Sequence, residues 1–226
     1  MGSAMYPDMR PVSHATERLE KELPVSALAL LAAALSGDAQ AAVEATMAAP
    51  EHLRGLVVHA LHERQVPPEV LRGALRKAWD SAHHGVRAAA GTKKRLIALF
   101  RYADFPTSSL PDHLTVWRGA AGLSLTMTAR GVSWTQRRPV ACWFACAPGP
   151  DFYDGPPLVL RAEIHRDQVV YHTDARGQAE VIFDGRPARV TVDGGADEWR
   201  ATAASYAAQA HAPDAEARGV TAGGTL

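Results

Sequence analysis

The stretch RYADFPTSSLPDHLTVWRGA, residues 101–120, marks a change in the amino-acid composition of the chain. Before it, Ala, Leu, Glu and Arg dominate and β-branched residues are few, which is typical of helices. After it, short runs rich in Val, Ile, Thr and aromatic residues are bounded by Gly, Pro, Asp and Ser, which is typical of strands joined by turns. The sequence therefore predicts an α+β protein with a helical N-terminal region followed by a mixed or antiparallel β domain.

Start and stop residues divide the helical region into segments. The expected helices cover about residues 14–22, 25–36, 38–48, 51–65, 67–85 and 90–103. Pro24 and Pro50 each precede one of them, and the segment 67–70 places proline and an acid in a first turn. Thr92 follows a glycine stop and is expected to cap the last of these helices.

The second half contains strand-like segments and one internal helix. The expected strands lie at 114–120, 131–135, 157–165, 168–173, 179–185 and 188–194. The helix is expected at about 136–147, with Thr135 as its N-cap and Pro139 in its first turn. The tail should begin as an Ala-rich helix at Trp199 and become mobile toward its end. We expect three parts: a helical region at 1–106, a β domain at 107–200 and a tail at 201–226.

Charge and composition argue against a disordered chain and against a protein whose overall basic charge attracts nucleic acid or membrane. With 226 residues and 47% hydrophobic content, the chain can bury a substantial core. Lys+Arg and Asp+Glu both number 24, so a nucleic-acid or membrane partner would have to use a local patch. The sequence contains no Walker loop, no GxGxxG after a strand and no GxSxG elbow.

The cysteines and the apolar segments bear on the compartment. Cys142 and Cys146 lie four apart, a spacing that shares a helical face, and as buried thiols they suit a reducing cytosol. No His or Cys lies nearby at zinc-finger spacing, so no metal is expected. The longest apolar stretch, 25–35, is too short to span a bilayer, and the N-terminus lacks the features of a signal peptide. The sequence therefore predicts a cytoplasmic protein with no membrane partner.

Three polar residues stand at corresponding places in three expected strands. Arg118 lies in LTVWRGA, Ser133 in GVSWT and Glu180 in GQAEVIFDG. Each has an ordinary interpretation: a surface ion pair, a turn residue and a solvated charge at the end of a strand. Their order and their contexts favour a shared functional site instead.

Together these segments resemble the Arg–Ser–Glu class of the ADP-ribosyltransferase superfamily. In that family, a first-strand arginine followed by a small residue, a serine segment leading into a helix and a late Gln/Glu-x-Glu element line one NAD-binding cleft. The corresponding segments here are VWRGA, GVSWTQRRPVACWFA and QAEVI, within residues 110–192. The chain is also similar to bacterial and phage proteins with a helical first half and a YRG…GxSWT…EVI second half. The resemblance implies a split β-sheet, and Trp134 departs from it where a threonine is common.

The resemblance implies a site that binds NAD as the ADP-ribose donor. The residues it assigns to NAD binding are Arg118, Gly119, Ser133, Trp134 and Thr135, and those it assigns to catalysis are Glu180, Gln178 and Ser133. Cleavage of the nicotinamide–ribose bond develops positive charge on the ribose, which a carboxylate at Glu180 would stabilise. Arg118 would clamp the pyrophosphate or its ribose with a forked set of donors.

The serine and the aromatic residues would support this chemistry. Ser133 would hydrogen-bond Glu180 or the nicotinamide ribose and so orient the carboxylate. Trp134 or Trp143 could line the nicotinamide pocket, but the apolar surroundings of Trp143 favour core packing. Trp117 should lie on the opposite strand face from Arg118 and belong to the core.

Gln178 bears on the acceptor. It lies two residues before Glu180, so on an extended strand both side chains would project to one face, where Gln178 could orient the nucleophile. In family members, glutamate at this position accompanies arginine as acceptor, whereas glutamine accompanies other groups, including asparagine side chains and guanine bases. The resemblance therefore implies an acceptor other than arginine, in either a protein or a nucleic acid.

These observations predict an NAD-dependent mono-ADP-ribosyltransferase, of the toxin or phage-conflict kind, and leave alternatives open. An NAD glycohydrolase would use the same residues with water as acceptor, and a non-catalytic module would only bind NAD or nucleic acid. The helical region would be a cap, a recognition module or a docking site for an antitoxin-like partner. The basic clusters at 93–101 and 137–138 fit either a phosphate-facing surface or an ordinary solvated helix. The histidines at 59, 62, 83, 84, 165 and 172 are expected to be structural or surface residues.

Overall fold

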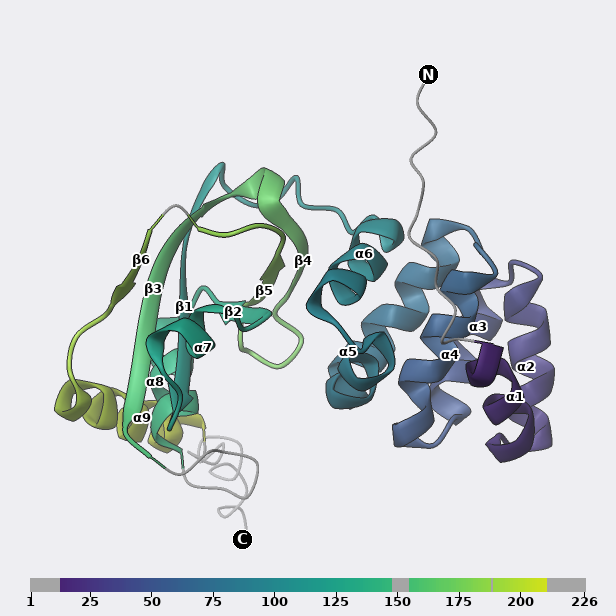
Figure 1. Cartoon of the computed structure of the whole chain (residues 1–226), viewed down its shortest axis with the longest axis horizontal. Coiled ribbons are helices and arrows are strands. Elements are labelled where there is room, and N and C mark those ends of the chain that lie inside the picture. Colours follow the sequence, from purple (N-terminus) through teal and green to yellow (C-terminus); the bar gives the residue numbers. More distant parts are fainter. Residues whose placement is uncertain (1–12, 148–154, 188, 211–226) are drawn as a thin grey trace, which may run out of the picture. The chain divides into compact units, whose positions relative to one another are not determined.

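A computed structural model describes residues 13–147, 155–187 and 189–210 (Figure 1). The chain is an α+β protein whose helices are mostly N-terminal and whose strands form an antiparallel sheet, as predicted. It divides into two compact units, Met1–Ser109 with Val170–Arg176 and Leu110–Val169 with Gly177–Leu226. We call them the helical unit and the sheet unit. The expectations for 1–12 and for the end of the tail at 211–226 lie outside the described residues.

The helical unit contains the predicted helices. Their bounds are α1 Ser13–Glu22, α2 Val25–Leu35, α3 Ala39–Ala48, α4 Glu51–Glu63, α5 Pro68–Ala90 and α6 Lys93–Ala103. Helix α5 is longer than expected, because it continues past 85 to Ala90 with Gly91 as its C-cap, and it contains one non-helical residue, Ala82. Thr92 caps α6 as predicted, since its hydroxyl accepts a 3.2 Å hydrogen bond from the backbone N–H of Arg95.

A segment distant in sequence completes the core of the helical unit. Tyr171, in strand β4 (Val169–Thr173), is fully buried. Its ring lies 5.1 Å from that of Phe100 and 4.6 Å from that of Phe105, measured between centroids. Its hydroxyl donates to Asp80 at 3.4 Å. Residues 170–176 therefore belong to the helical unit through aromatic packing, although they are strand-like in sequence.

Two buried histidines lie in α4. His59 is 4% exposed and His62 is 6% exposed, and neither His59 Nε2 nor His62 Nδ1 has a hydrogen-bond partner among the described residues. Burial lowers the pKa of His59 to about 4, with smaller contributions from His62 and Arg95. Burial also lowers the pKa of His62. Both side chains are therefore held neutral in the folded helical unit.

This arrangement predicts a loss of stability in mild acid. An unfolded histidine takes up its proton near pH 6.5, whereas His59 in the folded state does so only at about 4, so the unfolded state binds more protons between these values. We expect the unfolding free energy to fall by about 3 kcal/mol from His59 alone as the pH drops from 7 to about 4. Urea unfolding at several pH values, followed by circular dichroism, measures this loss. The variant His59→Leu should lose less stability than wild type over this range, and an equal loss in both proteins would contradict the assignment.

The sheet unit is built around the predicted strands. The six strands of the described chain have the order β4-β5-β2-β1-β3-β6. Besides β4, they are β1 His113–Ala121, β2 Ser133–Thr135, β3 Pro157–His165, β5 Glu180–Phe183 and β6 Val190–Val192. The helical segments of this unit are α7 Leu125–Ala129, α8 Arg138–Cys146, the 3-10 turn η1 Arg166–Gln168 and α9 Ala196–Ala210. Helix α7 was not predicted, because its five residues are too few to establish a period.

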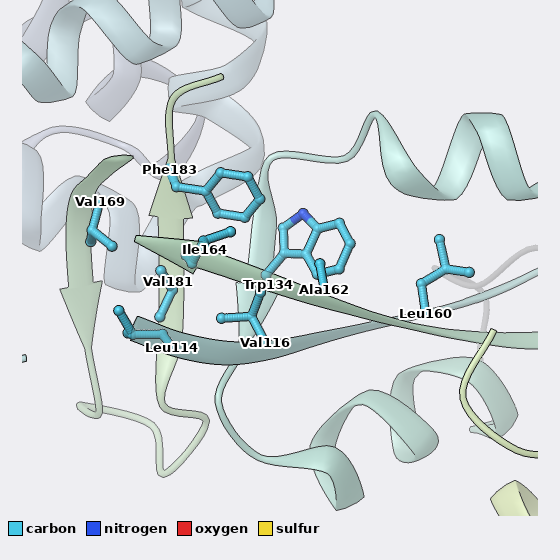
Figure 2. Packing of buried hydrophobic residues seen from close by; sticks show 9 residues of the cluster. All are labelled: Leu114, Val116, Trp134, Leu160, Ala162, Ile164, Val169, Val181 and Phe183. Atoms are coloured by element: carbon cyan, nitrogen blue, oxygen red, sulfur yellow. The ribbon is translucent and has the colours of Figure 1, made fainter. Parts of the chain in front are cut away.

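The sheet has two apolar faces. Leu114, Val116, Leu160, Ala162, Ile164, Val169, Val181, Phe183 and Trp134 form the cluster drawn in Figure 2. On the other face, α8 and α9 pack side by side and bury Val159 and Trp199 between helices and strands. Trp117 packs against this second cluster, which confirms that it lies on the opposite strand face from Arg118.

Strand β1 is paired very differently on its two sides. With β3 it is antiparallel along all nine residues, from His113↔His165 to Ala121↔Pro157. With β2 it is paired at a single position, Trp117↔Thr135. Backbone pairing between β1 and β2 is therefore limited to this one position, and Arg118 and Ser133 lie beside it.

Candidate active site

Glu180 is the first residue of β5 and is buried. The residue is only 5% exposed, and its Oε1 accepts a 2.5 Å hydrogen bond from the hydroxyl of Ser133. A carboxylate is rarely buried to this extent unless hydrogen bonds or charges compensate for lost hydration. Glu180 is therefore not a solvated charge at the mouth of a strand.

The pairing of β2 with β5 brings these two side chains together. Thr135 lies opposite Glu180 and Ser133 opposite Ile182. Because side chains alternate along a strand, Ser133, Thr135 and Glu180 project from the same face. The hydroxyl of Ser133 then reaches the carboxylate along the diagonal, across 47 residues of sequence.

Arg118 reaches the same site through the backbone. Its Nη1 donates a short hydrogen bond to the carbonyl oxygen of Ser133. The register Trp117↔Thr135 places Arg118 on the other face from the Ser133 side chain, which explains why it contacts the carbonyl and not the hydroxyl. Arg118, Ser133 and Glu180 thus form one connected chain of hydrogen bonds.

Gly131 makes this position of Arg118 possible, and sequence reasoning missed it. A methyl group at Gly131 would lie 2.0 Å from both Cζ and Nε of Arg118, so the guanidinium occupies the space that a side chain would take. The sequence signal was the glycine directly before the VSWT segment. The indole N–H of Trp134 also donates to the carbonyl of Gly131, at 3.3 Å.

Trp134, which the resemblance assigns to NAD binding, lies in the core of the sheet. Trp134 is 2% exposed, and its ring lies 5.7 Å from that of Phe183 in the cluster of Figure 2. Alternation along β2 sends its side chain to the opposite face from Ser133. Trp134 is therefore a core residue of the folded sheet. Trp143, expected in the core, packs partly buried against the cluster beneath α8 and α9.

Thr135 and Gly119 have structural roles that their sequence context did not reveal. The hydroxyl of Thr135 donates to the carbonyl of Gln178 at 2.5 Å and accepts from the N–H of Arg137 at 2.9 Å. The predicted N-cap was wrong, because α8 begins at Arg138 with Arg137 in the capping position. Gly119 lies against α8, where a methyl group would be 1.7 Å from the carbonyl oxygen of Ala141.

Gln178 and Glu180 do not lie together on one extended strand, which was the premise of their expected alignment. Strand β5 begins only at Glu180, and Ala179 has a positive φ of 43°. A left-handed residue between the two positions interrupts the strand alternation. A shared face for Gln178 and Glu180 therefore no longer follows from their spacing.

The basic pair before α8 is engaged within the sheet unit. Arg137 donates to the carbonyl of Gly177 at 2.8 Å, which joins the start of α8 to the loop before Glu180. Arg138 forms ion pairs with Asp193 at 2.6 Å and Glu198 at 2.7 Å. These contacts favour a structural interpretation of this cluster over a phosphate-facing one.

The other sequence expectations concern thiols, metals and membranes. Both cysteines are free thiols, Cys142 buried and Cys146 partly exposed, and burial raises the pKa of each. The described residues contain no group of three or more His, Cys, Asp or Glu side chains placed to hold a metal ion. Among the helices of the described ranges, none combines the length and the hydropathy needed to cross a membrane.

Comparisons of the chain with protein families, with curated proteins and with solved structures found no match.

Proposed function

We propose that the sheet unit is an NAD-dependent mono-ADP-ribosyltransferase with a split-sheet fold of the ADP-ribosyltransferase type. The observation that carries the proposal is the buried carboxylate of Glu180, hydrogen-bonded to Ser133, whose carbonyl is held by Arg118. These are the three residues that the sequence resemblance assigns to the family. The single register pair between β1 and β2 supports a sheet that splits at this junction.

The reaction breaks the bond between ribose C1′ and the nicotinamide nitrogen, and the electron pair of that bond leaves with nicotinamide. An acceptor group forms a new bond to C1′ and loses its proton. Positive charge develops on the ribose in the transition state, where a fixed carboxylate stabilises it more than water does. Glu180 supplies this charge, and the hydrogen bond from Ser133 holds the carboxylate in one orientation.

Arg118 has a double role in this proposal. Its hydrogen bond to the carbonyl of Ser133 positions the serine, and through the serine the carboxylate. A guanidinium carries five N–H donors, so the same group can also bind the diphosphate of NAD. Arg118 is the arginine that the family resemblance assigns to NAD binding.

A second candidate, an NAD glycohydrolase, is favoured by the backbone at Ala179. Because Ala179 is left-handed and β5 begins only at Glu180, the extended backbone that would align Gln178 with Glu180 as an acceptor-orienting residue is interrupted. Water would need no such residue. The two candidates share Arg118, Ser133 and Glu180 and differ in the acceptor.

The test of the proposed function is nicotinamide release from NAD by the full chain. NAD labelled in its adenylate is incubated with the protein alone and with separate additions of cell protein, RNA and DNA. We expect label to be transferred to one of the macromolecular pools. Release without transfer would establish the glycohydrolase, and no release under any of these conditions would contradict both enzymes.

Replacement of Arg118 by lysine should weaken NAD binding. Lysine keeps the positive charge but loses the forked donors, and a hydrogen bond to a charged group contributes about 1.5–3 kcal/mol. We therefore expect the Kd for NAD to rise roughly ten- to hundredfold, measured by calorimetry. Arg161→Lys is the matched control, since Arg161 lies on the neighbouring strand β3 and pairs with Glu163. Equal affinities of wild type and Arg118→Lys would count against Arg118 as an NAD ligand.

A further inference from the structure

Although the net charge of the whole chain is zero, positive and negative side chains are distributed unevenly along the helical unit. Residues 13–67, covering α1 to α4, contain four Lys and Arg against seven Asp and Glu. Residues 68–109, covering α5 and α6, contain eight Lys and Arg against three Asp and Glu. Positive charge is therefore concentrated on two consecutive helices, which contact each other.

Exposed basic side chains of α5 and of the segment 170–176 make up what we call the α5 basic surface, and the same segment also carries the exposed Asp174. The members of the surface are Arg76, Lys77, His84, Arg87 and Arg176, and all of them are exposed. Asp80 lies on α5 between these residues, but its carboxylate accepts from the hydroxyl of Tyr171, within the aromatic core described above. Arg72 is not included, because its Nε donates to the carbonyl of Ala103 at 2.8 Å.

The surroundings of His83 show that the charges of this surface converge. His83 follows the non-helical residue Ala82, and its ring lies 4.0 Å from that of His84. Burial lowers the pKa of His83 to about 4, and the neighbouring charges that add to this effect are His84, Arg176 and Arg87. All of these electrostatic neighbours are basic. Residues from α5 and from the segment 170–176 thus lie close enough to His83 to interact with it electrostatically.

The chemistry of this surface discriminates among anionic partners. The large hydrophobic residues exposed in the described ranges are Val25, Met47, Leu125, Met127 and Val192, and none lies on α5, α6 or 170–176. A membrane-binding helix would insert apolar side chains beside its basic ones, so an anionic lipid surface fits poorly. Arg76 and Lys77 precede the non-helical Ala82 and Arg87 follows it, so two successive helical stretches of α5 carry basic side chains that can contact phosphates of a nucleic-acid strand.

We propose that the α5 basic surface binds the phosphate backbone of a nucleic acid. Arginine and lysine side chains along one helix neutralise successive phosphates and release the counterions bound to them. This inference concerns the helical unit alone, and it neither requires nor tests the NAD chemistry proposed for the sheet unit. Binding of this kind is independent of base sequence and weakens steeply as salt increases.

The experiment compares wild type with the triple variant Lys77→Gln, Arg87→Gln, Arg176→Gln in the full chain. Fluorescence anisotropy with labelled single-stranded RNA, single-stranded DNA and duplex DNA measures Kd between about 50 and 200 mM salt. For wild type we expect binding to at least one probe, with log K falling linearly against log salt. In the triple variant, affinity should drop at least tenfold, and the slope for duplex DNA should shrink by about two to three units.

A matched triple variant, Arg18→Gln, Lys21→Gln, Arg64→Gln, removes the same number of exposed charges from the same unit. It should bind nucleic acid within about twofold of wild type, because a nonspecific charge effect is screened over roughly 10 Å. Circular dichroism verifies that both variants are folded. The proposal is overturned if wild type binds no nucleic acid at low salt, or if both triple variants lose the same affinity. Tighter binding to poly-glutamate or to anionic vesicles, lost in the α5 variant, would also overturn it.

Discussion

Glu180→Gln is expected to lower the rate of nicotinamide release from NAD by about 10²–10³-fold, the contribution of a positioned electrostatic group to a transition state. Glutamine has the shape of glutamate, and its amide oxygen can accept the hydrogen bond that Ser133 now donates to Oε1. The variant therefore removes the charge and keeps the packing. Glu180 is only 5% exposed, so its charge carries a desolvation cost that the neutral glutamine does not have. The variant should therefore remain folded.

The matched control for this prediction is Glu163→Gln. Glu163 lies on β3, is largely exposed, and accepts from Thr115 at 2.9 Å and Arg161 at 2.7 Å. Its replacement changes net charge by the same amount and should leave the rate unchanged. Rates are measured at saturating NAD, with circular dichroism as the check of folding. Turnover of Glu180→Gln at the wild-type rate would exclude the carboxylate from the chemistry.

Gly119→Ala should destabilise the sheet unit by about 3 kcal/mol, a value at the upper end for overpacking of a core. The added methyl group would lie 1.7 Å from the carbonyl oxygen of Ala141 and 2.9 Å from the backbone nitrogen of Ala145. Both atoms belong to the backbone of α8, so a change of side-chain rotamer cannot relieve the clash. Either the helix shifts away from β1 or the strand bends.

Urea unfolding of wild type, Gly119→Ala and Gly195→Ala measures this effect. Gly195 is the matched control in the same unit, because no atom lies within 4 Å of a methyl group placed there and its φ is not positive. We expect Gly195→Ala to unfold within about 0.5 kcal/mol of wild type. The resemblance assigned Gly119 to NAD binding, and this prediction assigns it to packing. A stable Gly119→Ala protein with weakened NAD binding would reverse that assignment.

The sequence alone predicted most of the secondary structure of the described chain, with α7, the end of α5 and the start of α8 as exceptions. Helical periodicity, prolines at helix starts and the Gly91–Thr92 boundary are local signals, and the observed helices follow them closely. The strands are likewise marked by β-branched runs between turn residues. The same local patterns singled out Arg118, Ser133 and Glu180 before any of their contacts was visible.

The residues around that triad depended on tertiary structure. A tryptophan beside a functional serine can be a ligand-binding residue or a core residue. Only the pairing of β2 with β5 showed that Trp134 belongs to the core. The spacing of Gln178 and Glu180 implied one face only for extended backbone, which the left-handed Ala179 does not provide. The position of Tyr171 in the helical unit depended on aromatic partners more than sixty residues away along the chain.

Secondary structure followed from local sequence, whereas the contacts of the site followed from tertiary structure, for a physical reason. Backbone hydrogen bonding and side-chain periodicity act over a few residues, so the sequence by itself determined which segments form most of the helices and strands and which polar residues they carry. Which face of a strand is covered, and which carbonyl an arginine reaches, depends on neighbours supplied by distant segments. The folded sheet therefore decided that Arg118 meets Ser133 through its backbone and that Glu180 is buried against the Ser133 hydroxyl.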